Sequence, residues 1–248
     1  MRSSNKSKKY MSMKHGGQIL SSTFAKISES VNEGVSANQI NTIIIDFLKQ
    51  NEAEPAFLGY QGFQYACCVS KNDEIVHGLP LEEKIFYDGD IVSIDIGVRY
   101  GGYIVDAART FIIGSIPDSI NHLVLTTETA FYKSIEGLSA HSFLGDIGYQ
   151  MQQYVESENL TIVKDLYSHG VGKTLHEDPL IPNFGKKGTG IQLNEGMTLA
   201  IEPMVNMGTK DIVTLPDQWT IATKDGKFSA HYENTIYIHH DSVEILTI

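Results

Sequence analysis

The sequence has little cysteine, and this shortage excludes a disulfide-stabilised protein. Only two cysteines, Cys67 and Cys68, occur among the 248 residues. They are neighbours, so on a strand their side chains point to opposite faces and cannot form an ordinary disulfide. The chain therefore fits a reducing compartment, and we expect a cytoplasmic protein.

The sequence also lacks any apolar run long enough to span a membrane, so we expect no membrane association. The first ten residues are basic and polar, with Arg2, Lys6, Lys8 and Lys9, and no apolar stretch follows them as it would in a secretory signal. We expect a flexible basic N-terminus over residues 1–10 and a single domain over residues 11–248, because no linker or composition break divides the rest.

Basic residues are scarce as well. Lysine and arginine number 19 against 30 aspartates and glutamates, which gives a formal net charge of −11. A basic groove for nucleic acid is therefore excluded for the chain as a whole. An acidic surface suits a substrate that presents a cation, although most acidic proteins owe their charge to solubility. The 42% hydrophobic content is that of an ordinary globular protein.

Hydrophobic periodicity predicts an α+β protein. Apolar residues at helical spacing predict helices over residues 19–30, 40–49, 123–138 and 147–158, with Ser36 as the N-cap of the second. β-rich segments predict strands over residues 66–70, 91–98, 103–113, 197–205, 219–222, 231–239 and 243–248. Gly101 and Gly102 join two of these strands as an antiparallel hairpin.

Five segments place one acidic residue or histidine among apolar or glycine residues. These residues are Asp95, Asp106, His169, Glu202 and Glu233. Each alone is weak evidence, because a lone Asp on a strand usually faces solvent and a lone Glu in apolar company is usually paired. Apolar residues flank them densely, however, and Arg109 is the main basic candidate nearby. Carboxylates that converge without basic partners indicate divalent cations.

Four carboxylates and one imidazole form an oxygen-rich donor set. Such a set suits a pair of Mn, Fe, Co or Zn ions better than a structural zinc site with thiolates. Two ions roughly 3.5–4 Å apart form the two-metal arrangement of many hydrolases. Two more histidines, His77 and His176, are either surface loop residues or donors to a developing oxyanion or scissile amide.

The ordered motifs closely resemble the type I methionine aminopeptidases of bacteria over about residues 33–248. The motifs are residues 72–80 (NDEIVHGLP), 88–95 (DGDIVSID), 168–172 (SHGVG), 196–203 (GMTLAIEP) and 232–235 (YENT). Several motifs in order are far more specific than any one of them. The resemblance implies the α+β pita-bread (creatinase/aminopeptidase) fold: a curved antiparallel sheet flanked by helices, with internal pseudo-two-fold symmetry. Residues 11–248 would then be one catalytic metallopeptidase domain.

The resemblance also implies a role for each candidate residue. Asp95 would bind one divalent ion, His169 and Glu202 the other, and Asp106 and Glu233 both. The ions would be Co, Mn, Fe or Zn, and the ligand types do not decide which. As catalytic residues, Glu202 would handle the proton of the attacking water, His77 would contact the scissile amide nitrogen and His176 would stabilise the oxyanion. The implied substrate-binding residues are Phe57, Tyr60, Phe63, Cys68, His77, Leu175, His176, Met204 and Trp219.

Six positions depart from the pattern of this family. Phe57 replaces a frequent Cys, Gln61 a His, Gln64 a Pro, Gly97 a Thr, Ser168 a Gly and His231 a Gln. None removes an implied metal ligand. These departures bear on substrate preference and rate more than on the type of reaction.

The implied function is removal of the initiator methionine from nascent proteins and peptides by a monomeric enzyme. Its partners would be the N-termini of nascent polypeptides, and contact with the ribosome is left open. One alternative is an aminopeptidase of the same fold with another preference, such as Xaa-Pro, although those relatives usually carry a large N-terminal domain. Another is a low-activity or non-catalytic paralogue, although such proteins typically lose metal ligands.

Overall fold

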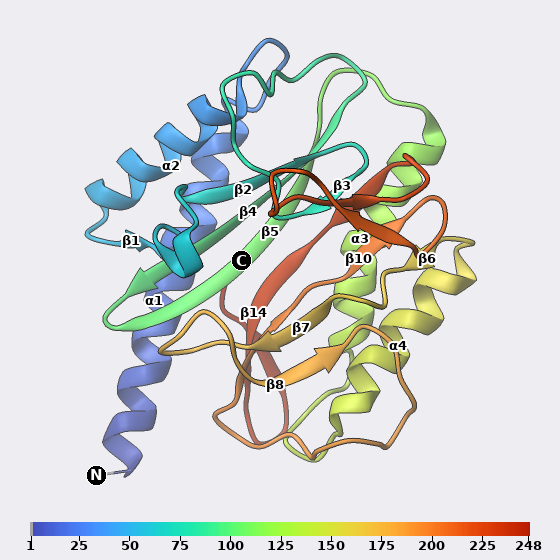
Figure 1. Ribbon diagram of the computed structural model, residues 1–248. Helices are drawn as coiled ribbons and strands as arrows, with labels where there is room; N and C mark the ends of the chain where they lie inside the picture. Colours follow the sequence, from blue (N-terminus) through green and yellow to red (C-terminus); the bar gives the residue numbers. More distant parts are fainter. Residues whose placement is uncertain (1) are drawn as a thin grey trace.

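The computed structural model describes residues 2–248, with side chains from residue 7 onward (Figure 1). The helices are α1 (Arg2–Ser28), α2 (Ala37–Gln50), α3 (Asp118–Ile135) and α4 (Leu144–Ser157), with a short 3-10 helix η1 (Tyr60–Gly62). The strands are β1 (Glu54–Pro55), β2 (Cys67–Lys71), β3 (Glu74–Val76), β4 (Ile91–Tyr100), β5 (Tyr103–Ile112), β6 (Thr161–Ile162), β7 (Tyr167–Gly170), β8 (Glu177–Pro182), β9 (Thr198–Ile201), β10 (Met204–Asn206), β11 (Ile212–Thr214), β12 (Ile221–Thr223), β13 (Ser229–His231), β14 (Glu233–Ile238) and β15 (Val243–Ile245).

A nine-stranded sheet forms the centre of the molecule. Its strand order is β1-β4-β5-β14-β9-β7-β8, with β2 also paired to β4 and β15 to β14. Two three-stranded sheets, β13-β10-β6 and β11-β12-β3, adjoin it. The pairs are antiparallel, as the sequence predicts. Strands from the two halves of the sequence therefore meet in one sheet.

The predicted hairpin joins β4 to β5. Tyr100 pairs with Tyr103, which leaves a two-residue loop of Gly101 and Gly102. Both glycines have positive φ, 58° and 83°. Two consecutive left-handed residues are what a tight hairpin turn needs, and glycine adopts them without steric cost. This turn sets the register between β4 and β5.

The helices lie behind the sheet in two pairs (Figure 1). One buried cluster joins α1 and α2 to β2, β4 and β5, through residues such as Leu20, Ile44 and Ile94. A second joins α3 and α4 to β9 and β14, through residues such as Phe131 and Ile236. Each half of the sheet thus has its own helix pair and its own core, as expected for the pita-bread fold.

The first helix is longer than the sequence pattern predicts. Periodicity indicates residues 19–30, whereas α1 begins at Arg2. The early turns carry few apolar residues and so give no helical signal, but tertiary contacts hold them. The Tyr10 hydroxyl donates to Glu244 at 2.9 Å, and Lys14 pairs with the same carboxylate at 2.9 Å. Met1 lies outside the described residues, and the division into a flexible residue 1–10 segment and a single domain stays a prediction.

Two of the predicted strands are each divided in two. The segment 197–205 breaks between β9 and β10 at Glu202 and Pro203, since proline has no N–H to continue a ladder. The segment 231–239 breaks between β13 and β14 at Tyr232. β10 and β13 pair with each other in the smaller sheet. The breaks therefore place Glu202 and His231 where the chain passes between two sheets.

The N-cap and cysteine expectations are confirmed. Ser36 caps α2 in a capping box with Gln39, whose side chain accepts from the Ser36 N–H at 2.8 Å. Cys67 and Cys68 are both free. Within residues 2–248, none of the helices has the length and apolarity that a membrane crossing requires.

Candidate metal centre and substrate cavity

The five predicted metal ligands come from five adjacent strands of the large sheet. Asp95 lies on β4, Asp106 on β5, Glu233 on β14 and His169 on β7, while Glu202 directly follows β9. These strands are consecutive in the sheet order β4-β5-β14-β9-β7. Residues far apart in the sequence are therefore brought to one region.

Strand register places the carboxylates on one face. Ala108 pairs with Asp95 on one side and with Glu233 on the other. Directly opposed residues on neighbouring antiparallel strands point to the same face. Asp106 is two residues from Ala108 and shares that face, because side chains alternate along a strand. Three acidic side chains therefore meet over the middle of the sheet.

The same argument brings in His169 and Glu202. His169 pairs with Ala200, and Glu202 lies two residues beyond Ala200. The His169 Nε2 is 3.6 Å from the Glu202 Oε1. The backbone of Glu202 is held from both sides: its N–H donates to the Ser168 Oγ and its carbonyl accepts from the Asn183 Nδ2, each at 2.9 Å.

Three buried carboxylate oxygens have no hydrogen-bond partner. They are the Oδ1 atoms of Asp95 and Asp106 and the Oε1 of Glu233. Among the described residues, no lysine or arginine forms an ion pair with these three carboxylates. A buried carboxylate without a donor is unfavourable, so this cluster needs cations.

Arg109, the basic candidate from the sequence, does not neutralise the cluster. Side chains alternate along β5, so Arg109, three residues after Asp106, faces the opposite side of the sheet. Its guanidinium donates to the backbone carbonyl of Glu233 at 2.6 Å and to the Asn234 Oδ1 at 2.7 Å. It also stacks on Tyr232, 4.4 Å from the ring centroid. Arg109 thus anchors β14 from the opposite face, and the ion-pair reading of the carboxylates fails.

The cluster resists ionisation when no cation is present. Burial is the main cause that raises the pKa of each carboxyl, and the neighbouring carboxyls raise it further for Asp95, Glu202 and Glu233. Burial raises the pKa of Asp106 to about 7. Four acids are therefore harder to ionise here than in water, which is the electrostatic signature of an ion site.

The His169 imidazole is prepared to be a metal ligand. Its Nδ1 lies 2.9 Å from the Gly170 carbonyl, which can only accept, so Nδ1 carries the proton. Nε2 then carries the lone pair that can bind a metal ion, and it faces Glu202. Burial lowers the pKa of His169 to about 4, so the ring is neutral at physiological pH. This carbonyl contact fixes both the tautomer and the ring orientation.

The donor atoms gather in two groups that fit divalent cations. One ligand atom from each of Asp106, His169 and Glu233 lies within 4.8 Å of the others, and the same holds for Glu202, His231 and Glu233. The two groups share Glu233. Carboxylates and imidazoles are the ligands of Mn, Fe, Co and Zn. His231 was noted from the sequence only as a departure, although its position two residues before Glu233 could have identified it.

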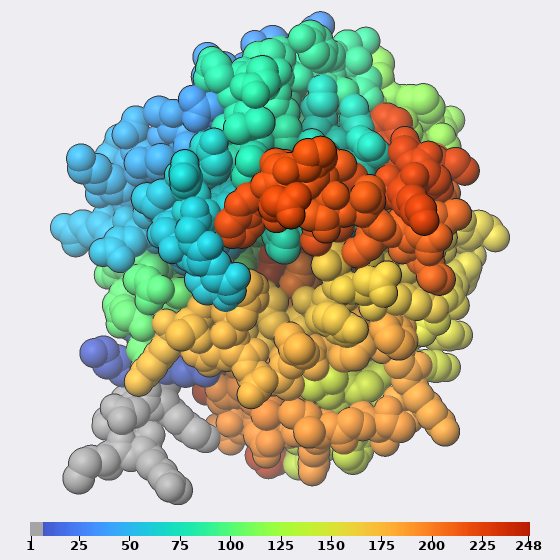
Figure 2. Space-filling model, viewed as in Figure 1, coloured from blue at the N-terminus to red at the C-terminus, as the bar shows by residue number. Residues whose placement is uncertain are grey.

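A cavity opens above the cluster. Figure 2 shows the hollow, with atoms of the C-terminal region at its floor. Its lining includes every predicted site residue except Met204, and also Gln61. The residues are Phe57, Tyr60, Gln61, Phe63, Cys68, His77, Asp95, Asp106, His169, Leu175, His176, Glu202, Trp219 and Glu233. Apolar and aromatic side chains around a few converging polar groups are typical of a small-ligand site.

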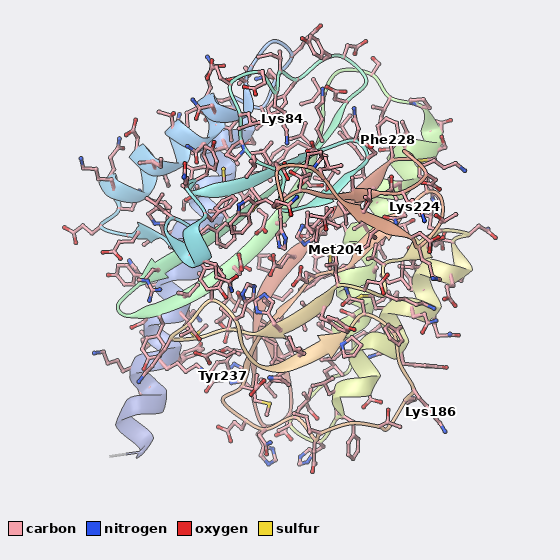
Figure 3. The ribbon with its side chains drawn as sticks, in the orientation of Figure 1. Lys84, Lys186, Met204, Lys224, Phe228 and Tyr237 are labelled. Carbon is pink, nitrogen blue, oxygen red and sulfur yellow. The ribbon has the colours of Figure 1, made fainter. Side chains whose placement is uncertain are left out.

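Met204 lines a neighbouring cavity instead, together with His77, His169, His176 and Glu202. It is the first residue of β10, which leaves the large sheet after Pro203 (Figure 3). It packs with Val76 in a separate apolar cluster. The change of direction at the proline explains why Met204 is beside the predicted pocket.

A chain of hydrogen bonds fixes the tautomer of His176. The Gln61 amide donates to the Tyr60 hydroxyl at 3.2 Å, and that hydroxyl lies 2.7 Å from the His176 Nδ1. The hydroxyl can donate its own proton to Nδ1 in the tautomer that carries the ring proton on Nε2. Burial lowers the pKa of the ring below its ordinary value. His176 is therefore a neutral hydrogen-bond donor.

His77 lies in a constrained loop at the end of β3. Its φ is 59°, a left-handed value that costs a non-glycine residue about 1–3 kcal/mol. The next residue, Gly78, donates to the Ser70 Oγ at 3.1 Å, and Lys84 pairs with Glu74 at 2.6 Å near the same turn (Figure 3). Burial lowers the pKa of His77 to about 4. The loop holds a neutral imidazole at the cavity wall.

Two departures from the family pattern, the large residue Phe57 and the small residue Gly97, fit together in space. A Cβ added at Gly97 would lie 2.5 Å from the Cε1 atom of Phe57. The Phe57 ring therefore occupies the space that a larger residue at position 97 would need. Phe57 lines the cavity next to Asp95, so the pair shapes the wall beside the metal cluster.

The antiparallel sheet brings carboxylates and an imidazole from separate strands to the floor of a small-ligand cavity. This arrangement defines a metal-dependent hydrolase. Residues 11–240 match metallopeptidase family M24. A methionine aminopeptidase of Clostridium perfringens is 44% identical over 236 residues, 95% of this chain and 94% of the relative. The crystal structure of a methionine aminopeptidase from Thermotoga maritima superposes with a TM-score of 0.95 at 43% identity over 96% of each chain.

The chain therefore belongs to the methionine aminopeptidases of metallopeptidase family M24. The resemblance drawn from the sequence motifs, the pita-bread fold and the hydrolase class are confirmed. A Xaa-Pro dipeptidase from Bacillus anthracis has a TM-score of 0.76 at 20% identity and covers 96% of this chain but only 60% of its own. That likeness shows the shared fold alone.

Proposed function

We propose that this chain removes the N-terminal methionine of nascent proteins and peptides by hydrolysing the first peptide bond at a pair of divalent metal ions. The observation that carries the proposal is the convergence of five donors, several with unpartnered buried oxygens, at the floor of one cavity. Membership of a metallopeptidase family supports a divalent metal, and four carboxylates and an imidazole on one cavity, more donors than a single ion needs, support a pair.

The proposed division of ligands follows the strand positions. Asp95 on β4 would bind one ion, His169 on β7 and Glu202 after β9 the other, and Asp106 and Glu233 on the two central strands would bind both. Two such ions supply Lewis acidity at the scissile carbonyl and lower the pKa of the attacking water. Metal supply and affinity order, more than the ligand types, decide between Co, Mn, Fe and Zn.

Glu202 is the proposed acceptor of the water proton. Its carboxylate faces the cavity, whereas its backbone is fixed by Ser168 and Asn183. A carboxylate beside the ions can accept the proton of the attacking water and later return it to the leaving amine.

His176 and His77 are the proposed hydrogen-bonding groups for the reacting amide. His176 presents its Nε2–H to the cavity because Tyr60 occupies Nδ1, so it can donate to the developing oxyanion. His77 lies on the same cavity wall and would contact the scissile amide nitrogen. Both rings are neutral near pH 7, which preserves their donor geometry.

The cavity wall suits a methionine side chain. Phe63 and Trp219 stack edge to face with centroids 5.0 Å apart, and Cys68 and Leu175 complete an apolar wall. A thioether gains about 0.3–1.5 kcal/mol from a contact with an aromatic ring. Since the similar relatives are named methionine aminopeptidases, the alternative of another N-terminal preference is not favoured. All implied metal ligands are present, which disfavours a non-catalytic paralogue.

The remaining expectations stay part of this proposal. Free Cys67 and Cys68 support a reducing compartment such as the cytoplasm. The family resemblance supports a monomer, and light scattering that gave a dimer mass would contradict it. Contact with the ribosome is testable by co-sedimentation.

A peptide panel tests the proposed function. Metal-stripped protein should regain activity with Mn, Co or Fe and release methionine from Met-Ala-Ser. It should leave Ala-Pro and an N-terminally blocked methionine peptide intact, because the free amine must reach the ions. Release of alanine from Ala-Pro would reassign the specificity, and no release from any peptide under any metal would refute the enzyme.

A further inference from the structure

His231 is a buried imidazole in the metal cluster that the proposed ligand set does not use. It is 1% exposed, and its Nε2 has no hydrogen-bond partner. A ligand atom of His231 lies within 4.8 Å of ligand atoms of Glu202 and Glu233. An unpartnered ring nitrogen that points at carboxylates, buried from solvent, is in the position of a metal donor.

The distance between the His231 ring and the Glu202 carboxylate fits two ligands of one ion better than it fits a hydrogen bond. The His231 Nε2 is 3.4 Å from the Glu202 Oε2. A direct N–H···O bond has a separation of about 2.7–3.2 Å. Two ligand atoms that each lie about 2.0–2.2 Å from one ion are roughly 2.8–3.1 Å apart in octahedral geometry and roughly 3.3–3.6 Å apart in tetrahedral geometry. His169 stands at 3.6 Å from the other oxygen of the same carboxylate. Glu202 is thus flanked by two imidazoles at similar spacing.

The backbone holds His231 in this position. It is the last residue of β13, and Thr110 holds its backbone through two hydrogen bonds. The Thr110 hydroxyl donates to the His231 carbonyl at 2.8 Å, and the His231 N–H donates to the Thr110 Oγ1 at 3.2 Å. Thr110 is itself tied to Ser93 at 2.8 Å. A ring carried by such a fixed backbone is preorganised for coordination.

We propose that His231 is an additional protein ligand of the ion held by His169 and Glu202. This inference rests on the proposed metal pair. A second imidazole makes the donor set of that ion richer in nitrogen, which favours Zn, Co or Fe over Mn. The chain would then differ in metal affinity and preference from relatives with an amide at this position.

Cobalt-loaded protein tests the ligand count directly. Metal-stripped wild type is loaded with two equivalents of Co²⁺, and hyperfine-shifted, solvent-exchangeable imidazole N–H signals are counted by proton NMR. Two signals are expected in the wild type, from His169 and His231, and one in His231→Gln. Glutamine keeps a side-chain hydrogen-bond donor but offers no ring nitrogen. A single signal in the wild type would overturn the proposal without any variant.

Calorimetric titration with Co²⁺ and Mn²⁺ gives an independent readout. Loss of an outer-shell partner costs about 10–100-fold in metal affinity, so loss of a direct ligand should weaken Co²⁺ binding at least about tenfold. The loss should be smaller for Mn²⁺. Equal affinities in the wild type and His231→Gln would show that His231 only contacts Glu202.

A surface variant controls for adventitious binding. His141, His240 and Asp241 form an exposed group that could hold a metal ion. His240→Gln removes that group, lies outside the cavity, and should keep both N–H signals and the cavity affinities. Failure of the proposed function is distinguishable: two signals with no release of methionine would retain His231 as a ligand, and release of methionine with one signal would reject it.

Discussion

Metal binding to this protein should release protons. Without cations, burial and mutual repulsion raise the pKa of Asp95, Glu202 and Glu233 well above their ordinary values, and that of Asp106 to about 7. Carboxyls must lose their protons to bind metal. His169 contributes nothing above pH 6, because its pKa is already lowered to about 4. The apparent affinity should therefore rise with pH.

The size of the effect follows from the number of acids. Because the pKa of Asp106 is about 7 and those of Asp95, Glu202 and Glu233 are raised, we expect net proton release as the pair of ions binds at pH 6.5. The slope of the logarithm of the apparent affinity against pH should equal the number of protons released.

Calorimetry in two weakly coordinating buffers of different ionisation enthalpy measures this number. The difference between the observed binding enthalpies at pH 6.5 gives the protons released. Asp95→Asn should release about one proton fewer, since an amide has none to lose. Binding with no proton release at pH 6.5 would show that the carboxylates are already ionised in the metal-free protein, and the electrostatic reasoning would be refuted.

Four further predictions follow from the geometry. Glu202→Ala should abolish methionine release while circular dichroism shows an intact fold; full activity would place the proton acceptor elsewhere. His176→Ala should lower turnover by roughly 10²–10³ in steady-state assays, as loss of an oxyanion donor does, and unchanged turnover would remove this residue from the mechanism. Gly97→Ala should lower the free energy of unfolding by about 1–3 kcal/mol through its clash with Phe57, and Phe57→Ala should cost less in that background than in the wild type; purely additive effects would contradict the pairing. Because the folded-state pKa of Asp106 is raised from 3.8 to about 7, a shift equivalent to about 4 kcal/mol, metal-free protein should lose stability as the pH rises from about 4 to 7, and an apo melting temperature that does not fall between pH 5 and 7 would oppose this sign.

The chemistry of the site was largely predictable from the sequence. Each of Asp95, Asp106, His169, Glu202 and Glu233 stands in a short motif whose apolar or glycine neighbours already mark a strand or a close turn. The structure brings all five together, as the sequence analysis requires. Motifs of this kind can be read locally because ligand type, strand alternation and turn glycines are properties of a few consecutive residues.

Contacts between distant segments could not be predicted in the same way. The part of α1 around Tyr10 and Lys14 contacts Glu244, near the other end of the chain. The tautomer of His176 depends on Tyr60 and Gln61, and the placement of Met204 depends on the turn after Pro203. None of these has a periodic or motif signal.

The sequence by itself determined which carboxylates and which imidazole are the candidate metal donors, and that they lie on or beside strands of an α+β domain. Only the tertiary structure decided that Phe57 fills the space above Gly97 and that His231 points its unpartnered nitrogen at Glu202. The physical reason is that residue type and alternation are local, whereas the distance between two side chains on different strands is set by register and packing across the whole sheet.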